Sequence, residues 1–233
     1  MIEGLLHEPA GLKNFGIFFL LAVLFLFFIL AFVMYAILSG RKVLGFMQLR
    51  YGPNHVGGKW GLLQTAADVL KLLIKEDIIP KLADRPLFIL APVIAFAPAF
   101  MVLAVIPFTD KMQFADLGIG LLYYIAISGI TTVGVVTAGW ASNNKYSLIG
   151  GMRAAAQMIS YEIPLVMSLV GVILLSGSLN LNDIVAAQQD VWFILLQPLA
   201  LLIFIIASVS EGNRTPFDLP EAESELVAGY HTE

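Results

Sequence analysis

The sequence contains no cysteine, which excludes disulfide bonds, thiolate zinc sites and cysteine-ligated iron–sulfur clusters from this chain. It has only three histidines, His7, His55 and His231, and all of them lie outside the long apolar segments. No two histidines are therefore placed to ligate a haem across a bundle of helices. Any redox chemistry must therefore use a cofactor or substrate that is held outside this chain or supplied to it.

Charged residues are also scarce. Of the 233 residues, 13% are charged and 59% are hydrophobic, whereas a soluble domain is about one quarter charged and half apolar. A soluble fold would lack enough polar residues to cover its surface, so the composition indicates a membrane protein. The net charge of −4 does not suggest a nucleic-acid partner.

The N-terminus lacks the pattern of a typical cleavable signal peptide. Glu3 and Glu8 precede the first apolar segment, and Lys13 is the only basic residue there. That segment, 15–38, is too long for a signal core and long enough to cross a membrane.

Five apolar segments have about the length that a helix needs to cross a bilayer of ~30 Å. They are continuously apolar and lack the alternation of a transmembrane barrel strand. We therefore predict an all-α, polytopic bundle in a single membrane domain over 1–233. Pro92 and Pro98 should kink the second span, and Gly134 and Ala138 in the third should permit close helix contact. The predicted spans are 15–38, 87–108, 117–140, 158–175 and 191–209.

Basic residues are distributed unevenly over the connecting loops. Eleven of the thirteen lysines and arginines fall in 39–86, 141–157 and 210–233, and only Lys13 and Lys111 lie on the opposite side. Loops rich in lysine and arginine stay in the cytoplasm. We expect the N-terminus outside and the basic loops inside, in the inner or plasma membrane of a bacterium.

The first basic loop also predicts an amphipathic helix over 60–75. It would lie at the membrane interface or bind a partner, and a simple surface connector is an equal alternative. Its polar stripe is Gln64, Asp68, Lys71 and Lys75, and its apolar side is Leu62, Leu63, Ala66, Val69, Leu70, Leu73 and Ile74.

Glu162 is a carboxylate about one turn inside the predicted fourth span. A charged carboxylate is costly in a bilayer, so this position suggests a residue that gains and loses a proton. The alternative is a side chain that reaches the headgroups or pairs with Arg153.

The C-terminal tail is rich in acidic residues after the fifth span. Asp218 and Glu221 match a helix cap with its capping box, and Pro220 suits a first helical turn. That interpretation leaves the other acids unexplained, and like charges this close favour shared protons. The candidate proton-handling residues of the tail are Glu211, Asp218, Glu221, Glu223 and Glu225.

Arg41, Lys42 and Arg50 follow the first span directly. On composition alone they are an ordinary cytoplasmic basic collar.

Four long segments resemble the H-subunit family of NADH-quinone oxidoreductase, the membrane subunit of respiratory complex I. They occur in family order, and the resemblance covers essentially the whole chain. The segments are RKVLGFMQLRYGPNHVG at 41–57, ADVLKLLIKEDIIP at 67–80, GWASNNKYSLIGGMRAAAQMISYEIP at 139–164 and EGNRTPFDLPEAESELVAGYHTE at 211–233.

The resemblance implies a helical subunit with more spans than are present here, so the sequence looks truncated at its C-terminus. It implies that the subunit joins the membrane arm to the peripheral arm and forms much of the quinone chamber. By the same resemblance, the quinone would be a substrate, the chain would bind no cofactor of its own, and flavin and iron–sulfur clusters would belong to partner subunits. Expected partners are the peripheral-arm quinone-site and iron–sulfur subunits, the small and antiporter-like membrane subunits, and membrane lipid.

The resemblance also implies roles for individual residues. An acidic path for protons would include Glu162, Glu211, Glu221, Glu223 and Glu225, with Asp218 beside it. The residues near the quinone passage or the peripheral-arm interface would be Arg41, Arg50, Asp68, Lys71 and Arg214. The family usually has an acidic residue directly before the Arg–Lys pair, and Gly40 stands there instead, which puts any role of that carboxylate in doubt.

Two other interpretations stay open. One is the related membrane subunit of a hydrogenase or formate-oxidising complex. The other is a stand-alone secondary transporter or proton channel, since intramembrane glutamates and broken helices suit that class as well.

Overall fold

The computed structural model describes residues 12–58, 60–109, 113–218 and 229–231. Throughout these residues the ordered elements are helices, which confirms the predicted all-α class. The chain forms two compact units, an N-terminal unit, Met1–Ile78, and a C-terminal unit, Ile79–Glu233. Each unit is described by itself.

The N-terminal unit is built on the long helix α2, Leu12–Met47. The predicted first span lies inside α2, and the helix continues through Gly40 into the basic residues that follow. It continues because no proline interrupts the segment, and it ends just before Leu49, whose φ of 53° lies in the left-handed region. Its stretch Phe19–Met47 is apolar and long enough to cross a membrane.

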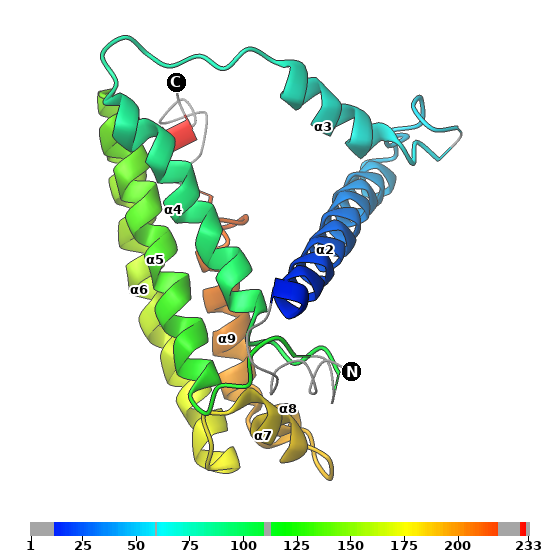
Figure 1. Ribbon diagram of the computed structural model, residues 1–233, viewed down its shortest axis with the longest axis vertical. Coiled ribbons are helices and arrows are strands. Elements are labelled where there is room, and N and C mark those ends of the chain that lie inside the picture. The colour runs from blue at the N-terminus through cyan, green and yellow to red at the C-terminus, as the bar shows by residue number, and fades with distance from the viewer. Residues whose placement is uncertain (1–11, 59, 110–112, 219–228, 232–233) are drawn as a thin grey trace. The chain divides into compact units, whose positions relative to one another are not determined.

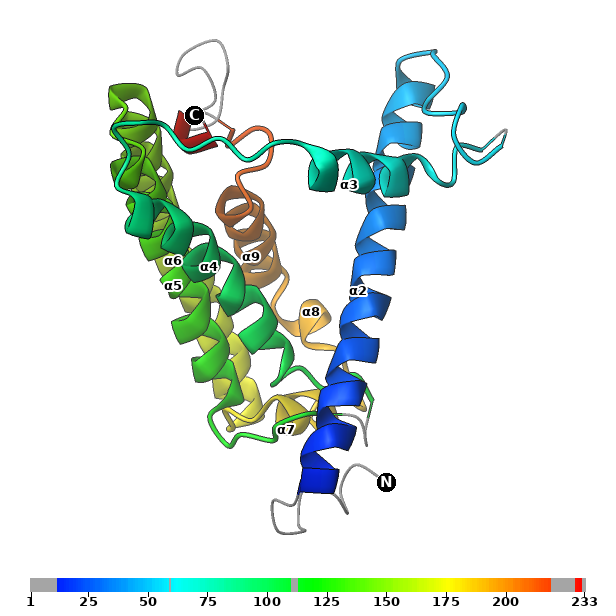
Figure 2. The same ribbon diagram turned by 45° about the horizontal axis from the view of Figure 1, so that its top comes forward.

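The predicted amphipathic helix is present as α3, Gln64–Ile74. It begins after a turn in which Gly57, Gly58 and Gly61 adopt positive φ, and it ends where Lys75 becomes extended. Figures 1 and 2 show α3 lying crosswise near the C-terminal end of α2. This packing brings Asp68 of α3 to Arg41 of α2.

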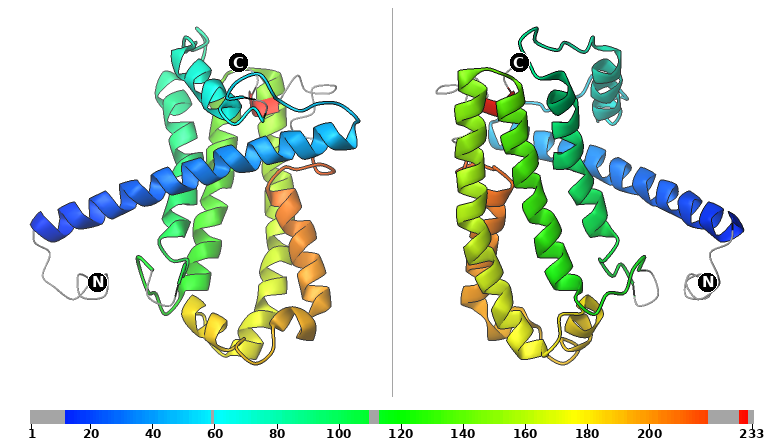
Figure 3. Two further views of the ribbon diagram at one scale, coloured as in Figure 1. Left: turned by 90° about the vertical axis from the view of Figure 1, so that its right-hand side faces the viewer. Right: turned by 60° about the vertical axis from the view of Figure 1, so that its left-hand side comes forward.

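The C-terminal unit contains four longer helices packed in chain order, α4 on α5, α5 on α6 and α6 on α9 (Figures 1 and 3). Short helices α7 and α8 lie between α6 and α9, and the short 3-10 helix η1 packs against α6. The bounds are Arg85–Leu103 for α4, Gly120–Ala141 for α5, Lys145–Ser176 for α6, Leu181–Ala186 for α7, Phe193–Leu196 for α8, Pro198–Glu211 for α9 and Gly229–His231 for η1.

Glycines allow the closest helix approaches in this unit. A Cβ atom on Gly134 of α5 would lie only 2.6 Å from the backbone nitrogen of Ala95 in α4. One on Gly139 would lie 2.8 Å from the carbonyl oxygen of Ser147 in α6. The predicted role of Gly134 in close helix contact is therefore confirmed.

Two helices begin well away from the predicted starts of their spans. The fourth span was expected from Met158, but α6 begins at Lys145, where the Asn144 side chain caps the Tyr146 N–H. The fifth predicted span is interrupted at Gln197, so that α9 has only 14 residues. Pro198 lacks the N–H group needed to continue the helix from α8.

Within the described residues, four helices are long and apolar enough to cross a membrane: α2, α4, α5 and α6. Both prolines of α4 lie within it, and the helix continues past them. Large apolar side chains such as Phe27, Phe28 and Leu174 are exposed. Such exposure is expected for surfaces that face lipid.

Candidate functional site

Glu162 lies near the middle of α6 because that helix begins earlier than its hydropathy suggests. Its side chain is half-buried and faces α5 at Gly129. A Cβ atom at Gly129 would come within 3.0 Å of Glu162 Oε1. The missing side chain of this glycine therefore provides the space that the carboxylate occupies.

Glu211 is the last residue of α9, and it is also half-buried. It lies close enough to Glu162 and to Tyr124 of α5 to interact electrostatically with both. Helices α5, α6 and α9 thus bring two of the predicted acids together. Neither glutamate forms an ion pair with another described residue.

The turn after α9 is ordered by backbone hydrogen bonds. Gly212 N–H donates to Ser208 O at 3.0 Å, and Arg214 N–H donates to Val209 O at 3.1 Å. Asn213 has a φ of 46°, as expected where a helix ends in a left-handed residue. The predicted residues Arg214 and Asp218 follow in this segment, and both are exposed.

The remaining acids of the predicted proton path, Glu221, Glu223 and Glu225, lie outside the described residues. The predicted capping box between Asp218 and Glu221 also extends beyond them.

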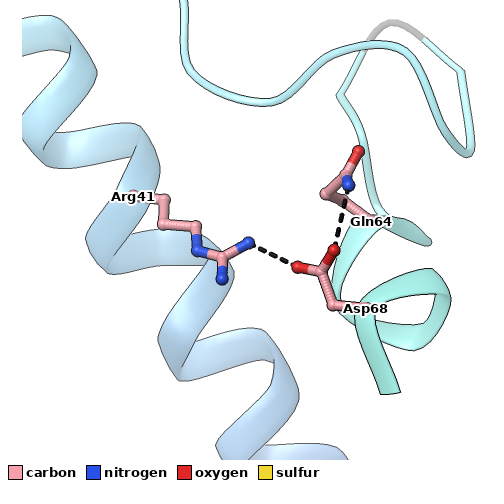
Figure 4. A network of polar contacts seen from close by, with 3 residues as sticks. All are labelled: Arg41, Gln64 and Asp68. Atoms are coloured by element: carbon pink, nitrogen blue, oxygen red, sulfur yellow. Dashed lines mark hydrogen bonds and ion pairs between the residues drawn. The ribbon is translucent and has the colours of Figure 1, made fainter. Parts of the chain in front are cut away.

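The N-terminal unit contains a second group of predicted residues (Figure 4). Arg41 Nη1 donates to Asp68 Oδ2 at 2.6 Å, and Gln64 Nε2 donates to Asp68 Oδ1 at 3.3 Å. These hydrogen bonds, with the positive charges of Arg41 and Lys71, hold the pKa of the Asp68 carboxyl below its ordinary value of 3.8. Asp68 therefore stays ionised at neutral pH and fastens α3 to α2.

Other basic residues of this unit make local contacts. Arg50 Nε donates to Gln48 Oε1 at 2.8 Å, and Lys42 Nζ lies 5.7 Å from the centre of the Trp60 ring. Lys71 is exposed in the last turn of α3, where a cation suits the helix dipole.

Two cavities of the C-terminal unit lie apart from the glutamate pair. One of about 810 Å³ adjoins the α5–α6 turn and is lined by Lys81, Trp140 and Lys145, among others. One of about 240 Å³ lies where α6 faces α8 and α9, beside Ser168 and Gln197. Neither is lined by Glu162 or Glu211.

Three residues of the site were not predicted as site residues from the sequence: Tyr124, Gly129 and Gln157. Tyr124 and Gly129 lie in an ordinary apolar span, and nothing in the sequence relates them to Glu162. Gln157 offers a signal, because it is an amide within the family-like segment 139–164, five residues before Glu162. Its Nε2 group lies 2.9 Å from Ser210 O, and this contact depends on the packing of α9 against α6. In the described residues, no group of three His, Asp or Glu side chains is placed to hold a metal ion.

Comparison with known proteins places these features in a family. The family described as NADH dehydrogenase matches residues 20–233. Proteins named as the H subunit of NADH-quinone oxidoreductase from Bacillus thuringiensis (strain Al Hakam), Bacillus cereus (strain AH187) and Bacillus anthracis (strain A0248) are each 76% identical to this chain. Each match covers 100% of this chain and 70% of the relative.

The apolar helices and the bacterial relatives together indicate a membrane protein of a bacterium. The match covers all four of the long segments that carry the family resemblance. The chain therefore belongs to the NADH dehydrogenase family.

Proposed function

We propose that this chain is the membrane subunit of an NADH-quinone oxidoreductase, and that it has no redox centre of its own. The observation that carries the proposal is the half-buried pair of Glu162 and Glu211, held beside Tyr124 within an apolar helical unit. The names of its relatives support the quinone branch over hydrogenase or formate-oxidising complexes.

In this proposal the chain forms part of a chamber that a membrane quinone enters. Electrons arrive from flavin and iron–sulfur clusters in partner subunits. Reduction of the quinone changes the local charge, and charges interact strongly where water is scarce. Two neighbouring carboxylates share protons more readily than an isolated one, because ionising both brings like charges together. Glu162 and Glu211 therefore respond to quinone reduction by changing their protonation.

The protonation change then passes to the rest of the complex. Glu221, Glu223 and Glu225 would extend the path from Glu211, with Arg214 and Asp218 beside it. The antiporter-like membrane subunits are the proposed recipients, and they translocate protons in response.

The N-terminal unit would serve the quinone passage and the junction with the peripheral arm. Arg41, Arg50 and Lys71 of this surface are exposed, and Asp68 is partly exposed. The ion pair of Arg41 with Asp68 fixes α3, whose apolar side is largely exposed for a partner or for lipid. We place this surface in the cytoplasm and the N-terminus outside, because the basic residues cluster on that side.

Substitution of the two glutamates tests the proposal. Glu162→Gln and Glu211→Gln remove the exchangeable proton while keeping side-chain size. We expect each to lower quinone reduction per assembled complex by about a hundredfold or more, in the range that general acid–base groups contribute. Membrane vesicles that contain the complete complex, with quinone reduction and the proton gradient measured together, provide the assay.

Asp190→Asn is the matched control, since Asp190 is an exposed carboxylate of the same unit outside the proposed path. Wild-type turnover and pumping in both glutamate variants would reject the proposal. Purification of the chain alone as a stable, active protein would instead favour a stand-alone transporter. Co-purification with iron–sulfur proteins and antiporter-like subunits supports the proposal.

A further inference from the structure

The segment that follows α9, residues 212–218, lies beside α6 because α9 is short. A helix of 14 residues is about 21 Å long, less than the ~30 Å hydrocarbon core. The chain then leaves helical geometry next to the middle of α6, and at Gly229 it packs on Gly150, in the N-terminal part of α6. Irregular backbone at such a depth needs hydrogen-bond partners from the protein.

Gln157 of α6 supplies these partners. Its Nε2 group lies 2.9 Å from Ser210 O, 3.0 Å from Phe217 O and 3.1 Å from Asn213 Oδ1, and its two N–H groups donate among these three acceptors. The three acceptors span the turn that follows Glu211. Ser210 is completely buried, and its carbonyl in the last turn of α9 also accepts from the Asn213 N–H at 3.1 Å, so Gln157 is its second donor.

A ring contact one turn along α6 fastens the same segment. The Tyr161 and Phe217 rings meet edge to face with their centres 5.1 Å apart. Gln157 and Tyr161 are four residues apart and so lie on the same side of α6. The same side of α6 therefore contacts the segment 212–218 through the amide of Gln157 and through the ring of Tyr161.

From these contacts we infer that Gln157 is a positioning residue that fixes the segment 212–218 and keeps Glu211 beside Glu162. The inference rests on the proposed function, because it assigns Gln157 a role in the proton path begun by this glutamate pair. Gln157 itself does not exchange protons. It acts by setting where Glu211 and Asp218 stand relative to α6.

The mechanism is geometric. Without the amide, Ser210 O and Phe217 O lose a donor, and the turn can move away from α6 toward water. Among the described residues, Tyr124 from α5 and Glu162 from α6 are the titratable groups that interact electrostatically with Glu211, and Arg214 follows three residues later in its own segment. Movement of the turn changes the distances from Glu211 to these groups, so the response of the pair to quinone reduction changes.

Two substitutions in the complete complex test this role. Gln157→Met keeps the length of the side chain and removes the donor. Gln157→Glu keeps the shape of the side chain but replaces the N–H donors with an oxygen atom, which then faces three hydrogen-bond acceptors. We expect turnover per assembled complex to fall at least about tenfold in both, since small misplacements of reacting groups have effects of this size. We also expect the pH profile of turnover to shift.

Gln197→Met is the matched control. Gln197 is likewise a half-buried glutamine whose Nε2 group donates across helices to a backbone carbonyl, that of Gly171 in α6, at 3.0 Å. It lies at the other end of α9, away from the segment 212–218. We expect this variant to reduce the amount of assembled complex at most, with turnover per complex and the pH profile unchanged.

The outcomes distinguish a failure of the inference about Gln157 from a failure of the proposed function. If Gln157→Met only lowers the amount of complex, as Gln197→Met does, and leaves the pH profile in place, Gln157 is merely structural and the inference is wrong. If Glu162→Gln and Glu211→Gln retain full activity, the proposed function itself fails. Loss in the glutamate variants together with a shifted profile in both Gln157 variants supports the inference.

Discussion

Gly129 of α5 lies beside the Glu162 carboxylate. In Gly129→Ala, the new methyl group would lie about 3.0 Å from Oε1, closer than a relaxed contact, so the carboxylate must move by a few tenths of an ångström. Because the end of a flexible side chain can make this movement, we expect little change in assembly. We expect a severalfold loss of quinone reduction per complex, measured in membrane vesicles.

Gly16→Ala provides the comparison for that variant. Gly16 is also in a helix, and apart from its chain neighbours and the nearby backbone of its own helix, a Cβ atom there has no atom within 4 Å. Equal activity in the two alanine variants would show that the space beside Glu162 is unimportant.

The glutamates themselves could be predicted from the sequence, because an acidic residue within or at the end of an apolar span is rare and costly. Their surroundings could not be predicted in the same way. Gly129 and Tyr124 are ordinary residues of an apolar span, and their relation to Glu162 and Glu211 depends on how α5, α6 and α9 pack. A sequence pattern within one helix does not contain that information.

The attachment of α3 to α2 depends on the contact between Arg41 and Asp68. We expect Asp68→Asn to loosen this attachment, because the amide loses the charge that pairs with the guanidinium 2.6 Å away. Spin labels on Leu44→Cys and Leu72→Cys, both exposed positions, would report a broader distance distribution between the helices. The chain has no native cysteine to interfere with labelling.

Arg41→Gln should broaden the same distribution, and the double variant should add little to either single one. Additive effects of the two substitutions would contradict a direct pairing.

The same contact has a predictable pH dependence. The pKa of Asp68 is lower in the folded unit than its ordinary value of 3.8, so its ionised form stabilises the attachment at all pH values above that value. The stabilisation is lost as pH falls through the lowered pKa, below 3.8. Distances between the same labels should broaden only in that acidic range, and broadening near neutral pH would point to another group.

Gly134 tests the packing of α4 on α5. A methyl group at this position would meet the backbone of Ala95 at 2.6 Å, and backbone atoms cannot move aside as a side chain can. We expect Gly134→Ala to destabilise the C-terminal unit by about 1–3 kcal/mol, the usual cost of overpacking. Thermal unfolding of the purified complex would measure it, and an unchanged midpoint would argue against this close contact.

The sequence predicts the apolar helices well but their ends less well. The segment 145–157 contains Lys145 and Arg153, so its hydropathy is too low for a span, yet it forms the first part of α6. The fifth apolar segment is long enough to cross a membrane, but Gln197 and Pro198 divide it. Hydropathy measures preference for lipid, whereas helix ends depend on caps and prolines.

The whole chain illustrates what composition can decide. The scarcity of charged residues and the long apolar segments indicate a helical membrane protein. The ordered elements of the described residues are helices, as predicted. The long family-like segments then predict the family, and the relatives confirm it. The proton path cannot be predicted from these segments in the same way, because it depends on which carboxylates lie next to one another in the folded protein.

Infrared difference spectroscopy of the complete complex tests that claim most directly, by comparing the carboxyl absorption before and after quinone reduction. We predict a change in the band of protonated carboxyl groups that is lost in Glu162→Gln and in Glu211→Gln and kept in Asp190→Asn. A carboxyl signal that persists unchanged in both glutamate variants would contradict the account.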